Sequence, residues 1–101
     1  MSIDINLIRH GSDAELRLGG SIDATNAPDV DKILQDVVSQ YVNILFDMEK
    51  LTYVSSAGLR AFKRAYIEAR RKGGTLSAKN VNRMVMEVFE VTGFTRMFRF
   101  I

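Results

Sequence analysis

One short apolar segment limits what this chain can fold into. Residues Val42-Asn43-Ile44-Leu45-Phe46 are rich in strand-forming side chains, and the run ends at Asp47. A continuous run of this kind is typical of a central strand that is buried on both faces. Segments with helical periodicity lie before and after it. The sequence therefore predicts strands that alternate with helices, which is the α/β class with a mixed sheet.

Two amphipathic helices are predicted around that strand. The first follows Thr25 or Asn26, either of which can cap it, and it carries Pro28 in its first turn, where proline is tolerated. The second stops at Gly73-Gly74. Residues three and four apart form the apolar face of each helix, and these residues are Val30, Ile33, Leu34, Val37, Val38 and Tyr41 in the first and Leu59, Phe62, Tyr66 and Ala69 in the second.

A third helix is predicted after Asn80, which can cap it, and Gly93 is expected at its C-terminal cap. Val81, Met84, Val85, Val88 and Phe89 are expected to face inward, with Met84 and Met86 filling the core.

Period-two alternation predicts the remaining strands. Residues Ile3–Leu7 and Ala14–Leu18 alternate on either side of the polar turn His10–Asp13, as an antiparallel pair does. Thr75–Lys79 is a further strand. Met97–Ile101 is a weak strand or a docking segment. Phe94, Phe98 and Phe100 either cover the sheet edge or form an exposed patch for self-association. Strands separated by helices should run parallel through right-handed crossovers.

Composition excludes several classes of site. The 101 residues include 14 basic and 12 acidic side chains, and a net charge of +2 does not argue for nucleic acid. Cysteine is absent and His10 is the lone histidine, which removes disulfides, thiolate chemistry and histidine-rich metal sites. No apolar run reaches the ~18 residues of a membrane span. We expect a single domain over residues 1–101, without cofactor or membrane insertion, that works in the cytoplasm.

The stretch Asp47–Leu59 carries the candidate chemistry, because it joins the central strand to the start of the second helix. Ligands of α/β sheets gather at the carboxyl ends of strands. Two serines, Ser55 and Ser56, stand at the helix entry. A phosphate on such a hydroxyl adds ~1.5 to 2 negative charges beside unpaired first-turn amides. The alternative is that Ser55 or Ser56 only caps the helix.

Val54–Arg60 resembles the switch segment of STAS domains, the anti-sigma factor antagonists. Gly20–Asp23 resembles the corner between the second strand and first helix of that family, and Phe46-Asp47 resembles its strand-ending aspartate. Gly73-Gly74 before a strand matches the next corner. The resemblance covers essentially the whole chain. It implies a STAS-like mixed sheet of four to five strands, with three to four helices packed mainly on one face.

The resemblance also implies a mechanism. Aligning Gly58-Leu59 with the Gly-Leu of the family places the phosphorylated serine on Ser56, with Ser55 as the alternative. Ser55 then stands where the family usually has aspartate, and Ala57 precedes the glycine. The unphosphorylated form would bind an anti-sigma factor that is a serine kinase of the histidine-kinase-like ATP-binding class. Phosphorylation would abolish binding, and a cognate phosphatase would reverse it.

The expected docking surface surrounds this serine and continues along the second helix. A phosphate on Ser56 would lie near Asp23 and Asp47. The alternative for Asp23 is a helix cap, and the alternative for Asp47 is a residue that caps or tightens the loop after the strand. Helical spacing places Ile67 among arginines, opposite Phe62, on a face that is either a docking surface or solvated. The partner-binding residues of this interpretation are Asp23, Ser55, Ser56, Ala57, Gly58, Arg60, Arg64 and Ile67.

Two other functions compete with this interpretation. A hydrolase with Ser56 as nucleophile needs a base and an oxyanion hole. The chain offers only His10, which is expected in a surface turn, and it has no Gly-x-Ser-x-Gly elbow. Without a P-loop it also supplies no ATP site, so we expect a binding module rather than an enzyme.

The second competing function is that of an accessory STAS subunit of a lipid-transport ATPase complex.

Overall fold

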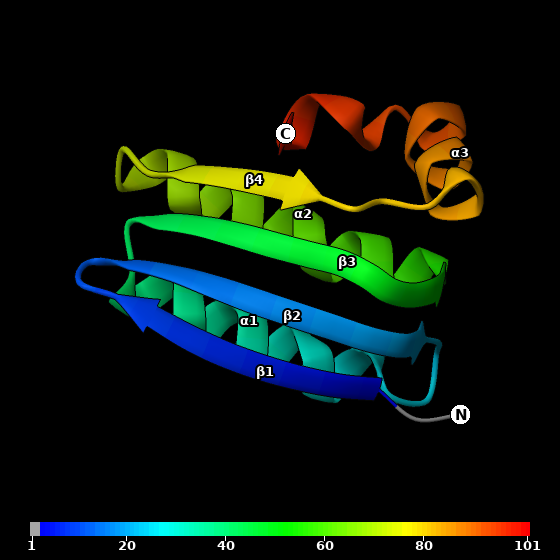
Figure 1. Cartoon of the computed structure of the whole chain (residues 1–101), viewed down its shortest axis with the longest axis horizontal. Helices are drawn as coiled ribbons and strands as arrows, with labels where there is room; N and C mark the ends of the chain where they lie inside the picture. The colour runs from blue at the N-terminus through cyan, green and yellow to red at the C-terminus, as the bar shows by residue number, and fades with distance from the viewer. Residues whose placement is uncertain (1–2) are drawn as a thin grey trace.

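The computed structural model describes residues 3–101, which form one five-stranded sheet with helices (Figure 1). The strand order is β1-β2-β3-β4-β5. Strand β1 is antiparallel to β2, and the other pairs are parallel. This confirms the predicted mixed sheet. In chain order the elements are β1 (Ile3–His10), β2 (Asp13–Ile22), α1 (Ala27–Gln40), β3 (Asn43–Val54), α2 (Ser56–Arg71), β4 (Thr75–Lys79), α3 (Arg83–Thr92), the 3-10 helix η1 (Phe94–Met97) and β5 (Arg99–Phe100).

Helices α1 and α2 cover the same face of the sheet, and the other face is open (Figure 1). Ile44, Phe46 and Met48 of β3 are therefore buried, whereas Leu45 and Asp47 between them are only partly buried. The predicted burial of this strand on both faces is wrong, because only one face has helices against it. None of the helices in residues 3–101 has the length and apolar character needed to cross a bilayer.

Strand β3 is much longer than the sequence predicts, since it continues through the expected loop to Val54. Arg17 pairs with Asp47 but Gly19 pairs with Lys50, so β3 has one more residue than β2 at this point, and a second irregularity follows Gly20. Extra residues of this kind are β-bulges, and they shift which side chains face the core. Period-two alternation stops after Met48 for this reason, and the next buried residues of β3 are Leu51 and Val54.

Asp47 is consequently not a strand-ending residue. It lies within β3, in register with Lys79 of β4. Partial burial raises the pKa of Asp47, but hydrogen bonds from the Asn80 amide and the Glu49 N–H, together with Lys79 and Arg17, lower it overall. Asp47 therefore contributes to the polar surface of the open face.

Helix α3 begins later than predicted. Its cap is Asn82, whose Oδ1 accepts the Val85 N–H at 2.9 Å, and not Asn80, which has a left-handed backbone with φ of 59°. Val85 is buried as predicted, but Met84 is 69% exposed. Met84 lies about 100° around the helix from Val85 and so leaves the buried stripe. Gly93 is confirmed as the left-handed C-cap, with φ of 76°.

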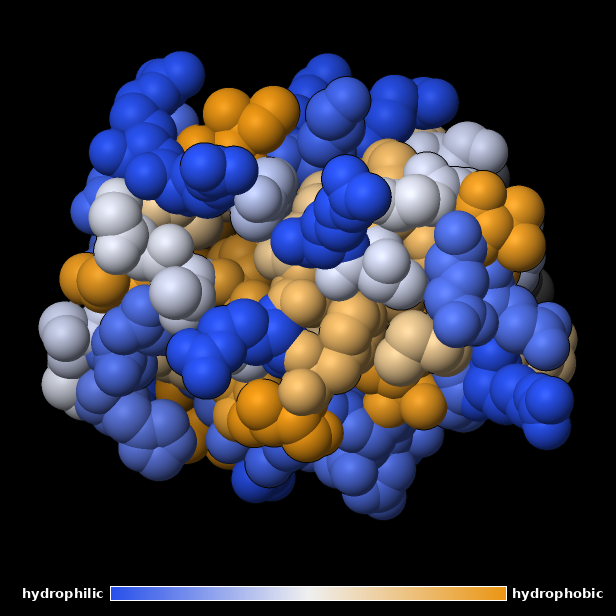
Figure 2. Space-filling model, turned by 90° about the horizontal axis from the view of Figure 1, so that it is seen from above, coloured by the Kyte–Doolittle hydropathy of each residue, from blue (hydrophilic) through white to orange (hydrophobic). Residues whose placement is uncertain are grey.

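The C-terminal segment covers the sheet edge, as one of its two interpretations predicts. Phe98 is buried in an aromatic cluster, 5.8 Å from Phe46 and 5.6 Å from Phe62 between ring centroids. Edge-to-face rings of this kind contribute beyond their buried area. Phe100 remains 36% exposed. The view onto this side of the molecule shows apolar residues surrounded by hydrophilic ones (Figure 2).

The corner after α2 leads to a first prediction. A Cβ on Gly74 would lie 1.9 Å from the Val42 carbonyl oxygen, whereas a Cβ on Gly73 would meet nothing within 4 Å. We expect Gly74→Ala to lower the free energy of unfolding by about 3 kcal/mol, because backbone must move. Gly73→Ala, the matched control, only strains a left-handed backbone and should cost about 1 kcal/mol. Urea unfolding measures both, and equal losses would contradict the packing argument.

Candidate functional site

The two serines at the start of α2 have different roles in the structure. The Oγ atom of Ser55 accepts the Gly58 N–H at 3.2 Å, and its carbonyl accepts the Leu59 N–H at 2.9 Å. Ser55 is therefore the N-cap. Ser56 is the first helical residue and is exposed, and its hydroxyl makes no hydrogen bond within residues 3–101. The helix is thus capped without using the Ser56 hydroxyl, which stays available for chemistry.

The ends of β2 and β3 hold the helix entry in place. The Ser55 N–H donates to the Ile22 carbonyl at 2.8 Å, and Ile22 is paired with Val54 in the sheet. Asp23 follows Ile22 directly, so it lies beside the serines, as the sequence predicts. Carboxyl ends of parallel strands are where α/β proteins place binding residues.

Asp23 is itself occupied in a turn. Its Oδ1 accepts the Thr25 hydroxyl at 2.6 Å, the Thr25 N–H at 2.9 Å and the Asn26 N–H at 3.1 Å. Hydrogen bonds from the Thr25 hydroxyl and the Asn26 amide lower the pKa of Asp23 below its ordinary value of 3.8. Asp23 is not the cap of α1, whose N-cap is Asn26, and its carboxylate instead stabilises the turn that precedes the helix. Its negative charge nevertheless lies beside the serines.

Gly58 has a packing role. It is buried, and a Cβ there would lie 2.7 Å from Cγ2 of Ile22 and 3.0 Å from Cγ1 of Val54. A side chain at Gly58 would therefore push the start of α2 away from the sheet. This corrects the expectation that Gly58 contacts a partner, because its surface is covered by the protein itself.

The outer face of α2 is basic with one apolar residue, as the helical spacing predicts. Arg60, Arg64 and Ile67 are exposed, whereas Phe62 is buried. Arg64 is committed to an ion pair, since its Nη1 lies 2.7 Å from Oδ2 of Asp31 on α1. Arg60 has no ion pair in the part of the chain that the structure describes. Arg60 and Ile67 are thus the free members of this face.

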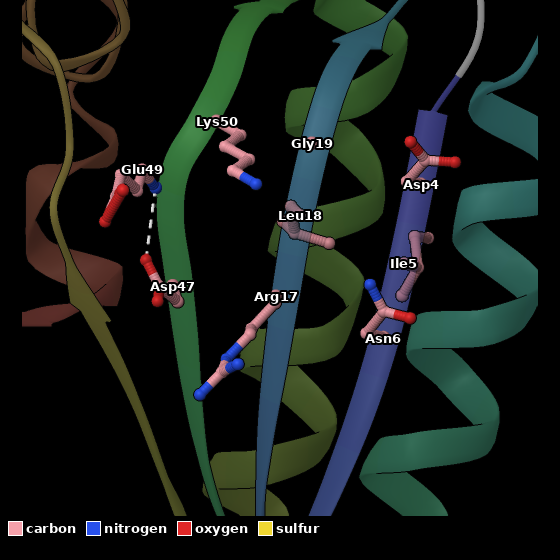
Figure 3. Close-up of a pocket in the computed structure, with 9 residues that line it drawn as sticks. All are labelled: Asp4, Ile5, Asn6, Arg17, Leu18, Gly19, Asp47, Glu49 and Lys50. Carbon is pink, nitrogen blue, oxygen red and sulfur yellow. Dashed lines mark hydrogen bonds between the residues drawn. The ribbon is translucent and has the colours of Figure 1, made fainter.

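A hollow of about 600 Å³ on the open sheet face is separate from these residues (Figure 3). It lies around Gly19 and is flanked by Arg17, Lys50 and Asp47. Asp47 precedes the end of β3 by seven residues, which is about 20 Å of strand. The expectation that a phosphate on Ser56 would lie near Asp47 is therefore wrong. Side chains of the hollow do not form part of the serine site.

The lone histidine lies far from the serines. His10 pairs with Asp13, at the start of β2, whereas Ser56 follows the end of the parallel strand β3. The two residues are therefore at opposite ends of the sheet, and His10 cannot act as a base for Ser56. Across residues 3–101, no three histidine or acidic side chains gather into a candidate metal site.

The sequence predicts Asn26 only as a possible helix cap, and its role in holding the Asp23 turn was missed. Asn26 accepts the Asp23 N–H at 2.9 Å and donates to the Ser21 carbonyl at 2.8 Å, which ties the turn to β2. An aspartate followed three residues later by asparagine was the available signal.

Comparison with known proteins gives a consistent family signal. The sequence model described as the STAS domain matches residues 4–101. A protein of Listeria monocytogenes named anti-sigma-B factor antagonist is 27% identical over 97 residues, which are 94% of this chain and 85% of that protein. A protein of Listeria innocua with the same name matches equally well.

Solved structures agree with this chain at the level of the fold. The unphosphorylated anti-sigma factor antagonist SpoIIAA has a TM-score of 0.83 at 17% identity and covers 97% of this chain and 88% of its own. The phosphorylated form of SpoIIAA from Bacillus gives 0.76 at 16% identity, with 97% and 91% covered. An anti-sigma factor antagonist from Mycobacterium paratuberculosis gives 0.85 at 19% identity, with 98% and 85% covered.

The different roles of the two serines are testable by stability measurements. Ser55→Ala removes the N-cap acceptor and should lower the free energy of unfolding by about 1 kcal/mol. Ser56→Ala, the matched control one residue along, removes a hydroxyl without partners and should change it by less than about 0.5 kcal/mol. Urea denaturation of the two variants separates the roles. A larger loss in Ser56→Ala than in Ser55→Ala would reverse the assignment.

The turn at Asp23 predicts a pH dependence. Because folding lowers the pKa of Asp23, the ionised carboxylate stabilises the protein above the ordinary value of 3.8, and this contribution is lost as the pH falls through the folded pKa. The difference in Tm between wild type and Asp23→Ala should therefore be largest near neutral pH and shrink in acid. Glu90→Ala, at an exposed helical carboxylate, is the control. A difference that does not change with pH would contradict the role of the ionised form.

Proposed function

The chain belongs to the STAS domain family, and from this we infer that it is an anti-sigma factor antagonist that switches partners when Ser56 is phosphorylated. The observation that carries the proposal is the exposed hydroxyl of Ser56 beside a helix cap that Ser55 supplies. The names of the Listeria relatives support the general role. We place this activity in the cytoplasm.

The chemistry at Ser56 is a phosphoryl transfer in which this chain is the substrate. The Ser56 oxygen attacks the γ-phosphorus of ATP held by the partner kinase, the hydroxyl proton leaves, and ADP is released. The product carries ~1.5 to 2 negative charges at the start of α2. Because the Gly58 N–H donates to the Ser55 hydroxyl oxygen and the Leu59 N–H to the Ser55 carbonyl, the Ser56 and Ala57 amides are the first-turn donors left without a partner in residues 3–101. The helix therefore accepts the phosphate without unfolding.

Arg60 gives the phosphate a second local interaction. It lies four residues after Ser56, so both side chains project from the same side of α2. Arg60 is exposed and has no ion pair elsewhere in residues 3–101, which leaves it free to pair with a phosphate on Ser56. Phosphorylation would then also remove Arg60 from contact with a partner.

The docking surface of the unphosphorylated form consists of Ser56, Ala57, Arg60 and Ile67, with the Asp23 turn beside them. We propose that it binds an anti-sigma factor serine kinase of the histidine-kinase-like ATP-binding class, and that the kinase contributes acidic groups opposite Arg60. In the complex a phosphate on Ser56 would be a desolvated charge facing the acidic groups of the kinase, which is costly. Affinity therefore falls although the domain keeps its fold, and a phosphatase restores binding.

Affinity capture from native extract tests this proposal. Wild type and Ser56→Ala should retain an ATP-binding kinase, identified by mass spectrometry, whereas Ser56→Asp should bind it at least about tenfold more weakly, a difference of about 1.4 kcal/mol. Ser55→Ala is the matched control and should still bind. Incubation of the captured kinase with ATP should add phosphate to Ser56.

Three results would contradict the proposal. Equal capture by Ser56→Ala and Ser56→Asp would remove the electrostatic switch. Phosphate on Ser55 alone would move the modification to the cap residue. Capture of a lipid-transport ATPase by every variant, with no kinase, would favour the accessory role instead.

A further inference from the structure

Strand β1 is a long sheet edge that nothing in residues 3–101 covers. It pairs with β2 along all eight of its residues, Ile3–His10, and stands first in the strand order. About 26 Å of backbone donors and acceptors therefore face outward. Natural monomers protect such edges with proline, bulges, very short strands or charged side chains. Strand β1 has charges at Asp4 and Arg9, but it contains no proline, and its register with β2 runs without a shift from Ile3 to His10.

An apolar margin accompanies this edge on the helix side of the sheet. Leu7 pairs with the buried Leu16 and therefore points toward the helix layer, yet it is 38% exposed. Ile33 of α1 is 39% exposed. It lies about 200° around the helix from Asp31, which contacts α2, so Ile33 is on the flank of α1 that faces away from α2. That flank is the β1 side of the molecule (Figure 1).

We propose that β1 pairs antiparallel with β1 of a second copy of this chain, which would form a dimer with a continuous ten-stranded sheet. The inference does not rest on the proposed function. A two-fold axis normal to the sheet makes the contact self-complementary and closed. In such a pairing, opposed residues point to the same face of the sheet. Because side chains alternate along a strand, the residue numbers of each opposed pair must add up to an even number. The same condition aligns the outward backbone groups of the two strands.

The side chains of β1 select one of these registers. With Leu7 on the axis, Leu7 meets its own copy on the helix side of the sheet, the side on which Ile33 of α1 is exposed. On the open side Asp4 then faces His10, twice, so that an imidazole N–H donates to a carboxylate. With Asn6 on the axis instead, Asp4 would face the apolar Ile8. Both registers leave Arg9 opposite an isoleucine, Ile5 in the first and Ile3 in the second. The pairing of Asp4 therefore decides between them, because opposed polar or charged pairs stabilise antiparallel strands, whereas a charge opposite an apolar side chain does not.

The opposite edge of the sheet is a poorer candidate for this contact. Strand β5 has only two residues, Arg99–Phe100, and Phe98 beside it is buried in the aromatic cluster. Pairing through β1 also leaves α2 free, because α2 lies behind β3 and β4 (Figure 1). Each dimer would therefore present two separate Ser56 surfaces.

Sedimentation over a concentration series tests the dimer. Wild type should rise toward twice the chain mass of 11.4 kDa as concentration increases. Leu7→Lys places two like charges on the axis and should return the mass to that of one chain. Val91→Lys, at a residue 86% exposed on α3, is the matched control and should still dimerise. Circular dichroism confirms that each variant is folded.

A charge exchange tests the register. Asp4→His and His10→Asp should each weaken the dimer severalfold, and the double variant should recover the affinity because it restores both pairs in reversed order. A wild type that stays monomeric at its highest soluble concentration would overturn the proposal, as would a dimer that Leu7→Lys leaves intact. If the losses of dimer affinity in the two single variants add up in the double variant, the proposed register is wrong. Kinase binding by monomeric Leu7→Lys would leave the proposed function unaffected.

Discussion

The site depends on one close contact, the packing of α2 onto the ends of β2 and β3 at Gly58. No other residue type fits there without displacing Ile22 or Val54, since an added Cβ would lie 2.7 Å from Cγ2 of the first and 3.0 Å from Cγ1 of the second. The hydrogen bond from Ser55 to the Ile22 carbonyl fixes the same junction from the backbone side. The Ser56 hydroxyl is exposed and oriented because these buried contacts set the direction in which the helix leaves the sheet.

Most of the fold could be predicted from local patterns. The alternation in β1 and β2, the apolar stripes of α1 and α2 and the glycine at the end of α3 each depend on interactions within a few residues. Strand β3 could not be predicted beyond Phe46, because its later residues pair with β2 through two bulges. Bulges depend on a distant strand, and they replace the period-two signal that would have identified Leu51 and Val54.

The site was predictable in position but not in the division of roles. Sequence order places two serines before a helix, yet only the structure separates the capping oxygen of Ser55 from the free oxygen of Ser56. The packing role of Gly58 could not be predicted either, since it depends on contact with Ile22, which is far away in sequence. The misplacement of Asp47 has one cause. An aspartate after an apolar run was interpreted as the strand end, whereas its neighbours Lys79 and Asn80 hold it inside the sheet.

The division of roles between Ser55 and Ser56 has a consequence for the stability of the folded chain over the proposed cycles of modification. If one oxygen both closed the helix and carried the modification, every turnover would briefly weaken the domain and expose it to proteolysis. Because Ser55 supplies the capping oxygen, the proposed modification of Ser56 would leave that hydrogen bond intact. The lifetime of the folded chain would then not depend on how often Ser56 is modified.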